Sequence, residues 1–327
     1  MPPKISPRSA AALALLLAAS LPALSAFAAD PPGGKLERVE GFSGMVKTGK
    51  NQYLVVHDIK SKSAAPRLGR LVIAKEGTFY QPIEVADWKG ERANDLESVC
   101  RLPSGEFLAA ESGVREEQEE GAEPKEKFGR LFRIAITGDT AEVRAAYAGA
   151  KVTISNKKGK GDDYEGLLCI PSGNRILIVQ GERGGSKPYP HSLLRWGWLD
   201  LEKDQLTFPA EGLAGLPVVP PTKDLPGTER RDIADLYADE KGVVWAAGAT
   251  DGGDQGPFRS YVYKLGQLQP ERNPPIALEK DLSPLWTIDG FKTEALGEAW
   301  TENGALAFGT EDEENGGVVR ELLEPAP

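Results

Sequence analysis

The residues best suited to chemistry are carboxylates that recur at the start of similar segments of the chain. They are Asp95, Glu97, Asp163, Glu165, Asp232 and Glu294. Asp95 with Glu97 and Asp163 with Glu165 form two pairs, each two residues apart. Residues i and i+2 of a strand point to one side, so the two members of each pair are expected to project together. Several carboxylates at one place repel one another unless a positive charge lies among them. Ca²⁺ takes six to eight oxygen ligands in flexible geometry, and we predict that these six residues bind it.

A structural role is an equally weighted alternative for the same carboxylates. They can accept hydrogen bonds from backbone N–H groups, or they can pair with arginines between neighbouring repeats. If the site holds a metal, its ligands are oxygens, because two histidines and two cysteines in the whole chain leave little for zinc or copper.

A second set of charged residues lies where the expected second strands end and the third strands start. Five of them are predicted to bind substrate: Glu111, Arg183, His191, Asp251 and Arg259. His57, Asp58, Glu311 and Asp312 lie in equivalent places. A rim that mixes carboxylates with cations can hold a metal ion together with an anionic ligand such as a phosphoryl group. Solvated loop charge is the alternative for each of these residues.

The common nucleophile and nucleotide-binding motifs are absent from the sequence. There is no G-x-S-x-G turn, and His57 followed by Asp58 has no identifiable serine or cysteine partner. Neither a G-x-x-x-x-G-K-[ST] loop nor a G-x-G-x-x-G motif after a strand occurs. A hydrolytic triad and nucleotide binding of these kinds are therefore not expected.

The carboxylates belong to five similar segments, each made of two short β-rich runs joined by a Gly-containing turn. The segments span residues 40–58, 95–112, 163–181, 232–248 and 292–310. Such a pattern is a hairpin signal. A third β-rich run follows every segment, and a fourth run follows all but the last. Equivalent positions are 54 to 69 residues apart, which leaves room for four strands and long loops in each unit.

These repeats predict an all-β fold, a single β-propeller domain over residues 29–327 with five four-stranded blades; six blades remain an alternative. The last unit lacks a fourth run, and an unpaired β-rich stretch at residues 35–40 precedes the first unit. That stretch can complete the last blade and leave no open sheet edge. We therefore expect the propeller to be closed by an N-terminal strand.

The direction of the strands sorts the loops onto two faces. The loops that lead into the first strands and out of the second strands share one face, which we call the top face. They are long, Gly-rich and charged, whereas the turns on the opposite bottom face are short. Binding residues are commonly placed on long loops held by a rigid scaffold, so function is expected at the top face.

Residues 1–28 read as a signal peptide. Lys4 and Arg8 precede an apolar run at residues 10–19, and Ala26-Phe27-Ala28 has the pattern of a cleavage site. An uncleaved membrane anchor is the alternative, although Ser20 and Pro22 interrupt the apolar run. We expect a periplasmic or secreted monomer without a membrane span after processing.

The charge of the mature chain narrows its partners. Loss of Lys4 and Arg8 changes the formal net charge from −10 to −12, which disfavours nucleic acid and anionic membrane as partners.

Cys100 and Cys169 project to opposite faces of adjacent repeats. A disulfide between them and two buried free thiols both remain open.

The repeats resemble the phytase-like, esterase-like group of bacterial β-propellers, whose blades open with a D-x-E-G motif. Asp163-Tyr-Glu-Gly matches that motif, Asp95-Leu-Glu-Ser is close to it, and Lys292-Thr-Glu-Ala with the acidic stretch 310–315 resembles the group's closing blade. The resemblance implies acidic, calcium-binding channel residues and hydrolysis of phosphoesters or esters. Ala234 stands where glutamate is expected, and five units are visible where calcium-dependent phytases have six.

Two functions of different class follow. In the first, Ca²⁺ held by Glu97, Glu165 and Glu294 polarises an oxygen of a phosphorylated or esterified small molecule and activates water. Arg183 or Arg259 then neutralises the charge of that ligand. In the second, the protein is not an enzyme, and its top face docks a cell-envelope protein or a glycan.

Overall fold

The computed structural model describes residues 38–60, 63–90, 92–113, 129–152, 162–185, 192–224, 230–250 and 252–324. The predicted signal peptide, much of the long top-face loops, and the predicted substrate residues His191 and Asp251 lie outside these ranges. Within them nearly all regular structure is β-strand, so the all-β prediction is confirmed. The exceptions are a short helix α1 (Ala210–Ala214) and two 3₁₀ turns, η1 (Pro221–Asp224) and η2 (Glu313–Asn315).

The first half of the fold consists of two four-stranded antiparallel meanders. The first contains β1 (Gly44–Gly49), β2 (Gln52–Val56), β3 (Leu68–Ala74) and β4 (Gly77–Val85). The second contains β5 (Leu96–Arg101), β6 (Phe107–Glu111), β7 (Arg130–Thr137) and β8 (Thr140–Ala148). Strands β4 and β8 pair in parallel over two residues, which joins the two meanders into one eight-stranded sheet.

Three further meanders follow. The third contains β9 (Tyr164–Ser172), β10 (Arg175–Arg183), β11 (Ser192–Asp200) and β12 (Gln205–Thr207), and β13 (Leu216–Val218) also pairs with β11. The fourth contains β14 (Arg230–Ala238), β15 (Val243–Thr250), β16 (Arg259–Leu268) and β17 (Ile276–Leu278), and β18 (Pro284–Asp289) also pairs with β16. The fifth contains β19 (Thr293–Gly297), β20 (Gly304–Thr310) and β21 (Val319–Leu323).

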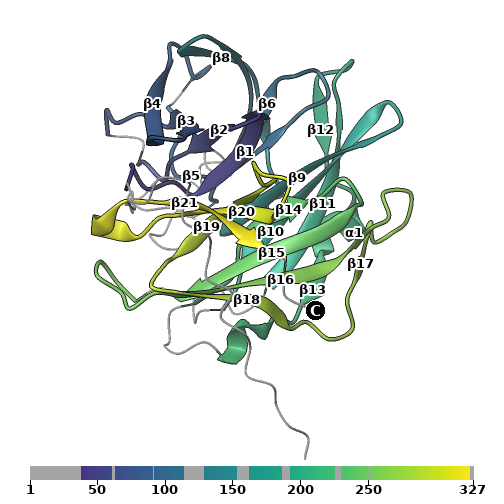
Figure 1. Ribbon diagram of the computed structural model, residues 1–327. Coiled ribbons are helices and arrows are strands. Elements are labelled where there is room, and N and C mark those ends of the chain that lie inside the picture. The colour runs from purple at the N-terminus through teal and green to yellow at the C-terminus, as the bar shows by residue number, and fades with distance from the viewer. Residues whose placement is uncertain are drawn as a thin grey trace, which may run out of the picture.

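The first strands of the meanders surround a central channel. Strand β1 contacts β5, β5 contacts β9, β9 contacts β14, β14 contacts β19, and β19 contacts β1 again. The two ends of the chain meet in this way, and the yellow C-terminal strands lie beside the purple strand β1 in Figure 1. Every first strand starts at the end of the channel where the predicted acidic residues lie. The top and bottom faces assigned from the sequence therefore correspond to the two ends of this channel.

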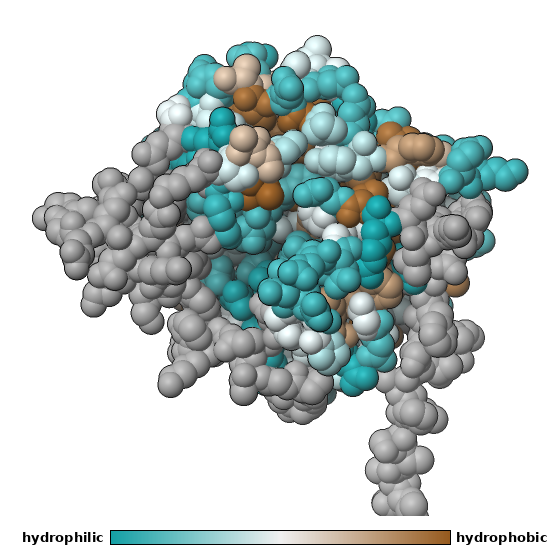
Figure 2. All heavy atoms as spheres, turned by 90° about the vertical axis from the view of Figure 1, so that its left-hand side faces the viewer, coloured by the Kyte–Doolittle hydropathy of each residue, from teal (hydrophilic) through white to brown (hydrophobic). Residues whose placement is uncertain are grey.

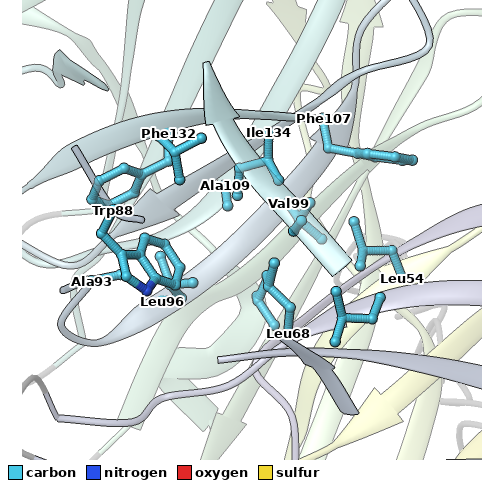
Figure 3. Close-up of a cluster of buried hydrophobic side chains, with 14 residues drawn as sticks. Leu54, Leu68, Trp88, Ala93, Leu96, Val99, Phe107, Ala109, Phe132 and Ile134 are labelled. Atoms are coloured by element: carbon cyan, nitrogen blue, oxygen red, sulfur yellow. The ribbon is translucent and has the colours of Figure 1, made fainter. Parts of the chain in front are cut away.

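The hydrophobic core is divided among the interfaces between consecutive meanders. One cluster, drawn in Figure 3, joins Leu54 and Leu68 of the first meander to Val99, Phe107 and Phe132 of the second. Four more clusters lie between the second and third, third and fourth, fourth and fifth, and fifth and first meanders. Each sheet therefore buries apolar side chains on both of its faces.

The N-terminal segment reaches the last meander, where a closing strand was predicted, but its described residues 38–43 form only an isolated bridge there and no strand. Residues 35–37 of the predicted strand lie outside the described ranges. Val39 forms an isolated antiparallel bridge with Gly317 through two backbone hydrogen bonds of 2.9 Å. Arg38 adds a hydrogen bond of 2.7 Å to the buried carboxylate of Asp312. Both contacts connect residues that are more than 270 positions apart in the sequence.

Short turns close the bottom face, and a disulfide lies beside them. Gly105 and Gly173 take positive φ values of 87° and 59° in the β5–β6 and β9–β10 turns, where glycine adopts such values at little cost. The open question of the two cysteines is resolved as a bond: Cys100 of β5 and Cys169 of β9 are joined, with Cα atoms 5.8 Å apart. The bond links adjacent meanders, as the repeat positions allow.

The outer surface carries both hydrophilic and hydrophobic residues. On the face shown in Figure 2, hydrophobic residues form separate small groups among hydrophilic ones. The large apolar side chains that are exposed in the described ranges come from different elements, and they are Phe79, Val152, Val219, Leu285 and Leu323. No helix within those ranges is long and apolar enough to cross a bilayer.

Candidate functional site

Three of the predicted glutamates occupy the same special position in their strands. Glu97 in β5, Glu165 in β9 and Glu294 in β19 are each the extra residue of a β-bulge, opposite a break in the pairing with the second strand. A bulge twists the strand locally and re-aims a side chain. The regular i, i+2 alternation assumed from sequence is therefore interrupted at these glutamates, and all three are buried near the start of the channel-lining strands.

A cation from the chain itself lies between two of these glutamates. Arg231, at the start of β14, places Nη1 3.2 Å from Glu165 Oε2 and also pairs with Glu294 Oε1. The fourth meander, which has Ala234 in place of a glutamate, thus contributes the opposite charge. Burial raises the pKa of both Glu165 and Glu294, and the Arg231 guanidinium opposes that rise.

Further pairs extend this arrangement on both sides into a row of alternating charges. Arg183 Nη1 lies 3.1 Å from Asp163 Oδ2 and 3.8 Å from Glu165 Oε1. On the other side, Lys292 is almost fully buried and places Nζ 3.2 Å from Glu294 Oε1 and 3.0 Å from Glu311 Oε2. We call the residues of this row, Asp163, Arg183, Glu165, Arg231, Glu294, Lys292 and Glu311, the ion-pair row.

A second acidic group lies beside the row. One carboxylate oxygen from each of Asp58, Asp95 and Glu97 lies within 4.8 Å of the others. Lys60 pairs with two of them, with Nζ 2.5 Å from Asp58 Oδ1 and in contact with Asp95 Oδ1. Asp58 follows the second strand of the first meander, whereas Asp95 immediately precedes β5 and Glu97 is its second residue. We call Asp58, Asp95 and Glu97 the acidic trio.

Glu97 is the member of the acidic trio whose carboxylate has the fewest hydrogen-bond and ion-pair partners. It is 4% exposed, and its buried Oε2 atom has no hydrogen-bond partner in the described structure. Burial, and then the charges of Glu165 and Asp95, raise its pKa well above the ordinary value. Burial and the charge of Asp58 likewise raise the pKa of Asp95. Against burial, a hydrogen bond with Asp95 and the Lys60 charge lower the pKa of Asp58 to about 2.

The remaining predicted metal ligands are engaged with their own chain. Asp163 accepts a hydrogen bond of 3.0 Å from the Ser112 hydroxyl in addition to its pair with Arg183. Asp232 accepts one of 2.8 Å from Ser192 and another from Thr222, and Arg230 Nε lies 3.7 Å from Oδ1. The six predicted carboxylates are thus divided: Asp95 and Glu97 belong to the trio, and the others are in ion pairs or hydrogen bonds.

The predicted substrate residues lie in different environments. Glu111 is fully buried and makes a two-oxygen pair with Arg130, with contacts of 2.6 and 3.0 Å, and it also accepts the Asn94 backbone N–H at 2.8 Å. Arg183 belongs to the ion-pair row. Arg259 pairs with Asp289 and lines a cavity of about 560 Å³ that Arg38 and Phe258 also line. His191 and Asp251 lie outside the described residues.

A smaller cavity adjoins the acidic trio. It has a volume of about 270 Å³ and is lined by Asp58, Glu311, Glu313 and the segment 39–41. Residues 311–316 contribute to this cavity on one side and to the 560 Å³ cavity on the other. Burial, and then the charge of Glu294, raise the pKa of Glu311 to about 7, although Lys292 opposes the rise.

His57 also lines the 270 Å³ cavity, but it has a structural role. Its Nδ1 lies 2.6 Å from the Gly41 carbonyl, which can only accept, so the proton is on Nδ1. The Tyr80 hydroxyl then donates to Nε2 over 3.0 Å. Burial lowers the pKa of His57, so the imidazole is held neutral between these two partners.

Sequence reasoning missed the basic residues that neutralise the carboxylates. Lys60, Arg231 and Lys292 each lie within three residues of an acidic residue that the sequence had marked. The available signal was the fourth unit, where Arg231 precedes a segment that lacks its glutamate. A missing carboxylate beside a new cation indicates that the fourth unit supplies the positive charge that pairs with Glu165 and Glu294.

Comparisons with known proteins complete the description of the site. No protein-family model matches the chain, and no curated protein sequence is similar enough to count as a relative. Solved structures that resemble it include Xyloglucan PUL GH43B of Bacteroides ovatus (TM-score 0.41, 14% identity, 79% of this chain and 47% of that chain). A thermostable family-43 glycoside hydrolase (0.44, 8%, 89% and 90%) is another, as is a protein of unknown function from Dyadobacter fermentans (0.43, 13%, 93% and 84%).

These similarities are remote. The chain spans about half the length of the Bacteroides ovatus protein. All three identities are below 15% and all three TM-scores are below 0.5. They therefore assign neither a substrate nor a residue role to this chain, and the argument about function depends on the geometry of the site.

Proposed function

We propose that this protein is an exported five-bladed propeller that binds Ca²⁺ at the top of its channel and hydrolyses a small phosphorylated or esterified ligand there. The proposal depends on the acidic trio. Asp58, Asp95 and Glu97 bring three carboxylate oxygens within 4.8 Å of one another, and Glu97 Oε2 is buried without a partner. An orphaned buried oxygen is costly unless something binds it.

The charges support a divalent cation. Three ionised carboxylates carry a charge of −3, which Lys60 reduces to −2. Ca²⁺ in place of Lys60 reduces it further, to −1. Oxygen is the ligand type that Ca²⁺ prefers, and water or substrate can complete a coordination shell of six to eight. The Lys60 side chain is 42% exposed, so it can turn outward when a metal replaces it. Asp58 also lines the 270 Å³ cavity, which gives the metal site access to a ligand.

The residues around the cavities fit hydrolysis of an anionic ligand. Bound Ca²⁺ would supply a Lewis acid that polarises the substrate oxygen and lowers the pKa of water. Arg38 and Arg259 line the adjoining cavity and can donate hydrogen bonds to an anionic ligand beside their carboxylate partners, Asp312 and Asp289. Glu311 has a pKa of about 7 and lines the cavity of Asp58, so it can give a proton to the leaving oxygen near neutral pH.

Calcium binding is tested first, by calorimetric titration of the EDTA-treated protein and by thermal unfolding with and without Ca²⁺. We expect Ca²⁺ to raise Tm and Glu97→Gln to weaken binding by about tenfold or more, because one charged ligand is lost. Glu76→Gln, in an exposed turn, is the matched control. A wild-type protein that binds no Ca²⁺ and unfolds identically in EDTA would remove the metal from the proposal.

Hydrolysis is tested separately with phosphomonoester, phosphodiester and carboxylester substrates in the presence of Ca²⁺. We expect turnover by the wild type and a large loss in Glu97→Gln. Complete inactivity of a folded, calcium-bound protein would overturn the enzymatic part and favour the alternative function, docking of a cell-envelope protein or glycan. Export is checked by the N-terminus of the protein recovered from the periplasm or medium, which should be Ala29.

A further inference from the structure

The lower half of the channel is a cavity distinct from the acidic site. It has a volume of about 670 Å³ and lies between the C-terminal ends of the five first strands. Each of these strands contributes an apolar side chain to its wall: Met45, Val99, Leu167, Leu236 and Leu296. The trio and the ion-pair row lie at the opposite, N-terminal ends of the same strands. The channel is therefore charged at the top, whereas apolar and charged side chains together line its bottom.

Two of the three acidic side chains that line the bottom cavity have partners within the chain. Glu298 pairs with Lys47 at 2.5 Å. The carboxylate of Asp239 accepts the backbone N–H groups of Lys241 and Val243, each at 2.9 Å. These two carboxylates are thus used in holding the rim together, and the charge of Glu298 is balanced by Lys47.

Two cations at the same rim are free for a ligand. Arg101, the last residue of β5, and Lys241 are exposed and line the cavity. In the described ranges neither side chain has an ion-pair partner within 4.0 Å or a hydrogen bond, whereas the exposed Glu240 offsets one of the two charges. The three basic and three acidic side chains of the rim sum to zero, so what the rim offers an anion is the Arg101 guanidinium itself and not a net positive charge.

We infer that the bottom cavity binds a small amphipathic molecule with an apolar body and one anionic group, such as a medium-chain carboxylate. The apolar body would lie among the five first strands, and the anionic group would meet Arg101. A volume of about 670 Å³ is in the ordinary range for small-molecule sites, which are mainly apolar with a few placed polar groups. This site is independent of the calcium site proposed above.

The cavity wall is fixed before any ligand arrives. Cys100 and Cys169 both line it, and their disulfide joins β5 to β9. The turn at residues 239–242 is held by the hydrogen bonds to Asp239, and Gln267 Nε2 donates to the Lys241 carbonyl at 2.8 Å. A preformed site loses less conformational entropy on binding.

The test uses the fluorescent probe 1-anilinonaphthalene-8-sulfonate, which combines an apolar ring system with one anionic group. We expect one probe per folded chain, displaced by dodecanoate more effectively than by the neutral dodecanol. Arg101→Glu should weaken probe binding by about tenfold and abolish the preference for dodecanoate. Arg144→Glu, a reversal at another exposed arginine, is the matched control and should change neither.

Two results would overturn the inference: no saturable probe binding to the folded wild type, or binding that Arg101→Glu leaves unchanged. EDTA separates this site from the calcium site, because we expect probe binding at the bottom cavity to be the same with and without metal. Loss of probe binding in EDTA would place the probe at the top face and would also contradict the inference.

Discussion

At the scale of single residues, most buried carboxylates of the channel are paired with cations from the chain itself. The ion-pair row alternates carboxylates with Arg183, Arg231 and Lys292, so most buried charges have a neighbour of opposite sign. Replacing one partner of a buried pair leaves the other charged and desolvated, which costs far more than the net value of the pair. The trio differs because Lys60 faces three carboxylates.

Arg231→Met should therefore destabilise the protein strongly. It leaves Glu165 and Glu294 buried without the guanidinium they share, and we expect a loss of about 3–5 kcal/mol. The loss should be smaller at low pH, where both glutamates are protonated. Urea unfolding at neutral and acidic pH measures this, with Arg144→Met as the surface control. A loss below about 1 kcal/mol at neutral pH would contradict the account of the ion-pair row.

Glu311 makes a pH-dependent contribution with a defined sign. Its folded-state pKa is raised from 4.5 to about 7 by burial first and then by Glu294. A raised pKa means that its share of stability is present below pH 4.5 and is lost as pH rises toward 7. Glu311→Gln should flatten the decline of unfolding free energy across that window. Glu302→Gln, at an exposed turn, should keep the wild-type profile.

At the scale of elements, local patterns could be predicted and distant partners could not. The five hairpins were evident because a strand, a Gly-containing turn and a second strand are contiguous in sequence. The bulges at Glu97, Glu165 and Glu294 carry no local signal of that kind, and they re-aim the side chains that matter most. The Arg231 to Glu165 contact spans 66 residues and depends on how β14 packs beside β9, so no spacing in the sequence reveals it.

The disulfide is an element-scale constraint that can be removed cleanly. It connects β5 to β9 over 69 residues, and closing a loop of that length typically stabilises a protein by about 2–4 kcal/mol. The double variant Cys100→Ala/Cys169→Ala should show a loss of that order in urea unfolding under oxidising conditions. Wild type measured with reductant should approach the variant, whereas the variant itself should not respond to reductant.

At the scale of the whole molecule, closure is the property that makes the other features possible. The five first strands contact one another in a ring, and the ring places carboxylates from the first, second, third and fifth meanders at one end of one channel. The same ring leaves the apolar cavity at the other end. Both candidate sites thus depend on the last meander meeting the first.

The segment that seals this junction is short, so its contribution can be measured directly. Val39 bridges Gly317, and Arg38 is an ion-pair partner of Asp312, whose side chain is 1% exposed. A chain beginning at residue 41 loses both contacts with the last meander. Relative to a chain beginning at Ala29, we expect a loss of about 2 kcal/mol, or roughly 3 °C in Tm.

Arg38→Ala in the chain beginning at Ala29 separates the ion pair from the strand pairing. Arg38→Ala should cause only part of the stability loss seen on truncation, because the Val39 to Gly317 hydrogen bonds remain. If truncation left Tm unchanged, the interface between β1 and β19 alone would hold the ring, and the N-terminal segment would have no role in closure. If truncation instead abolished calcium binding while the fold survived, closure would act on the site by positioning residues 311–316 beside Asp58.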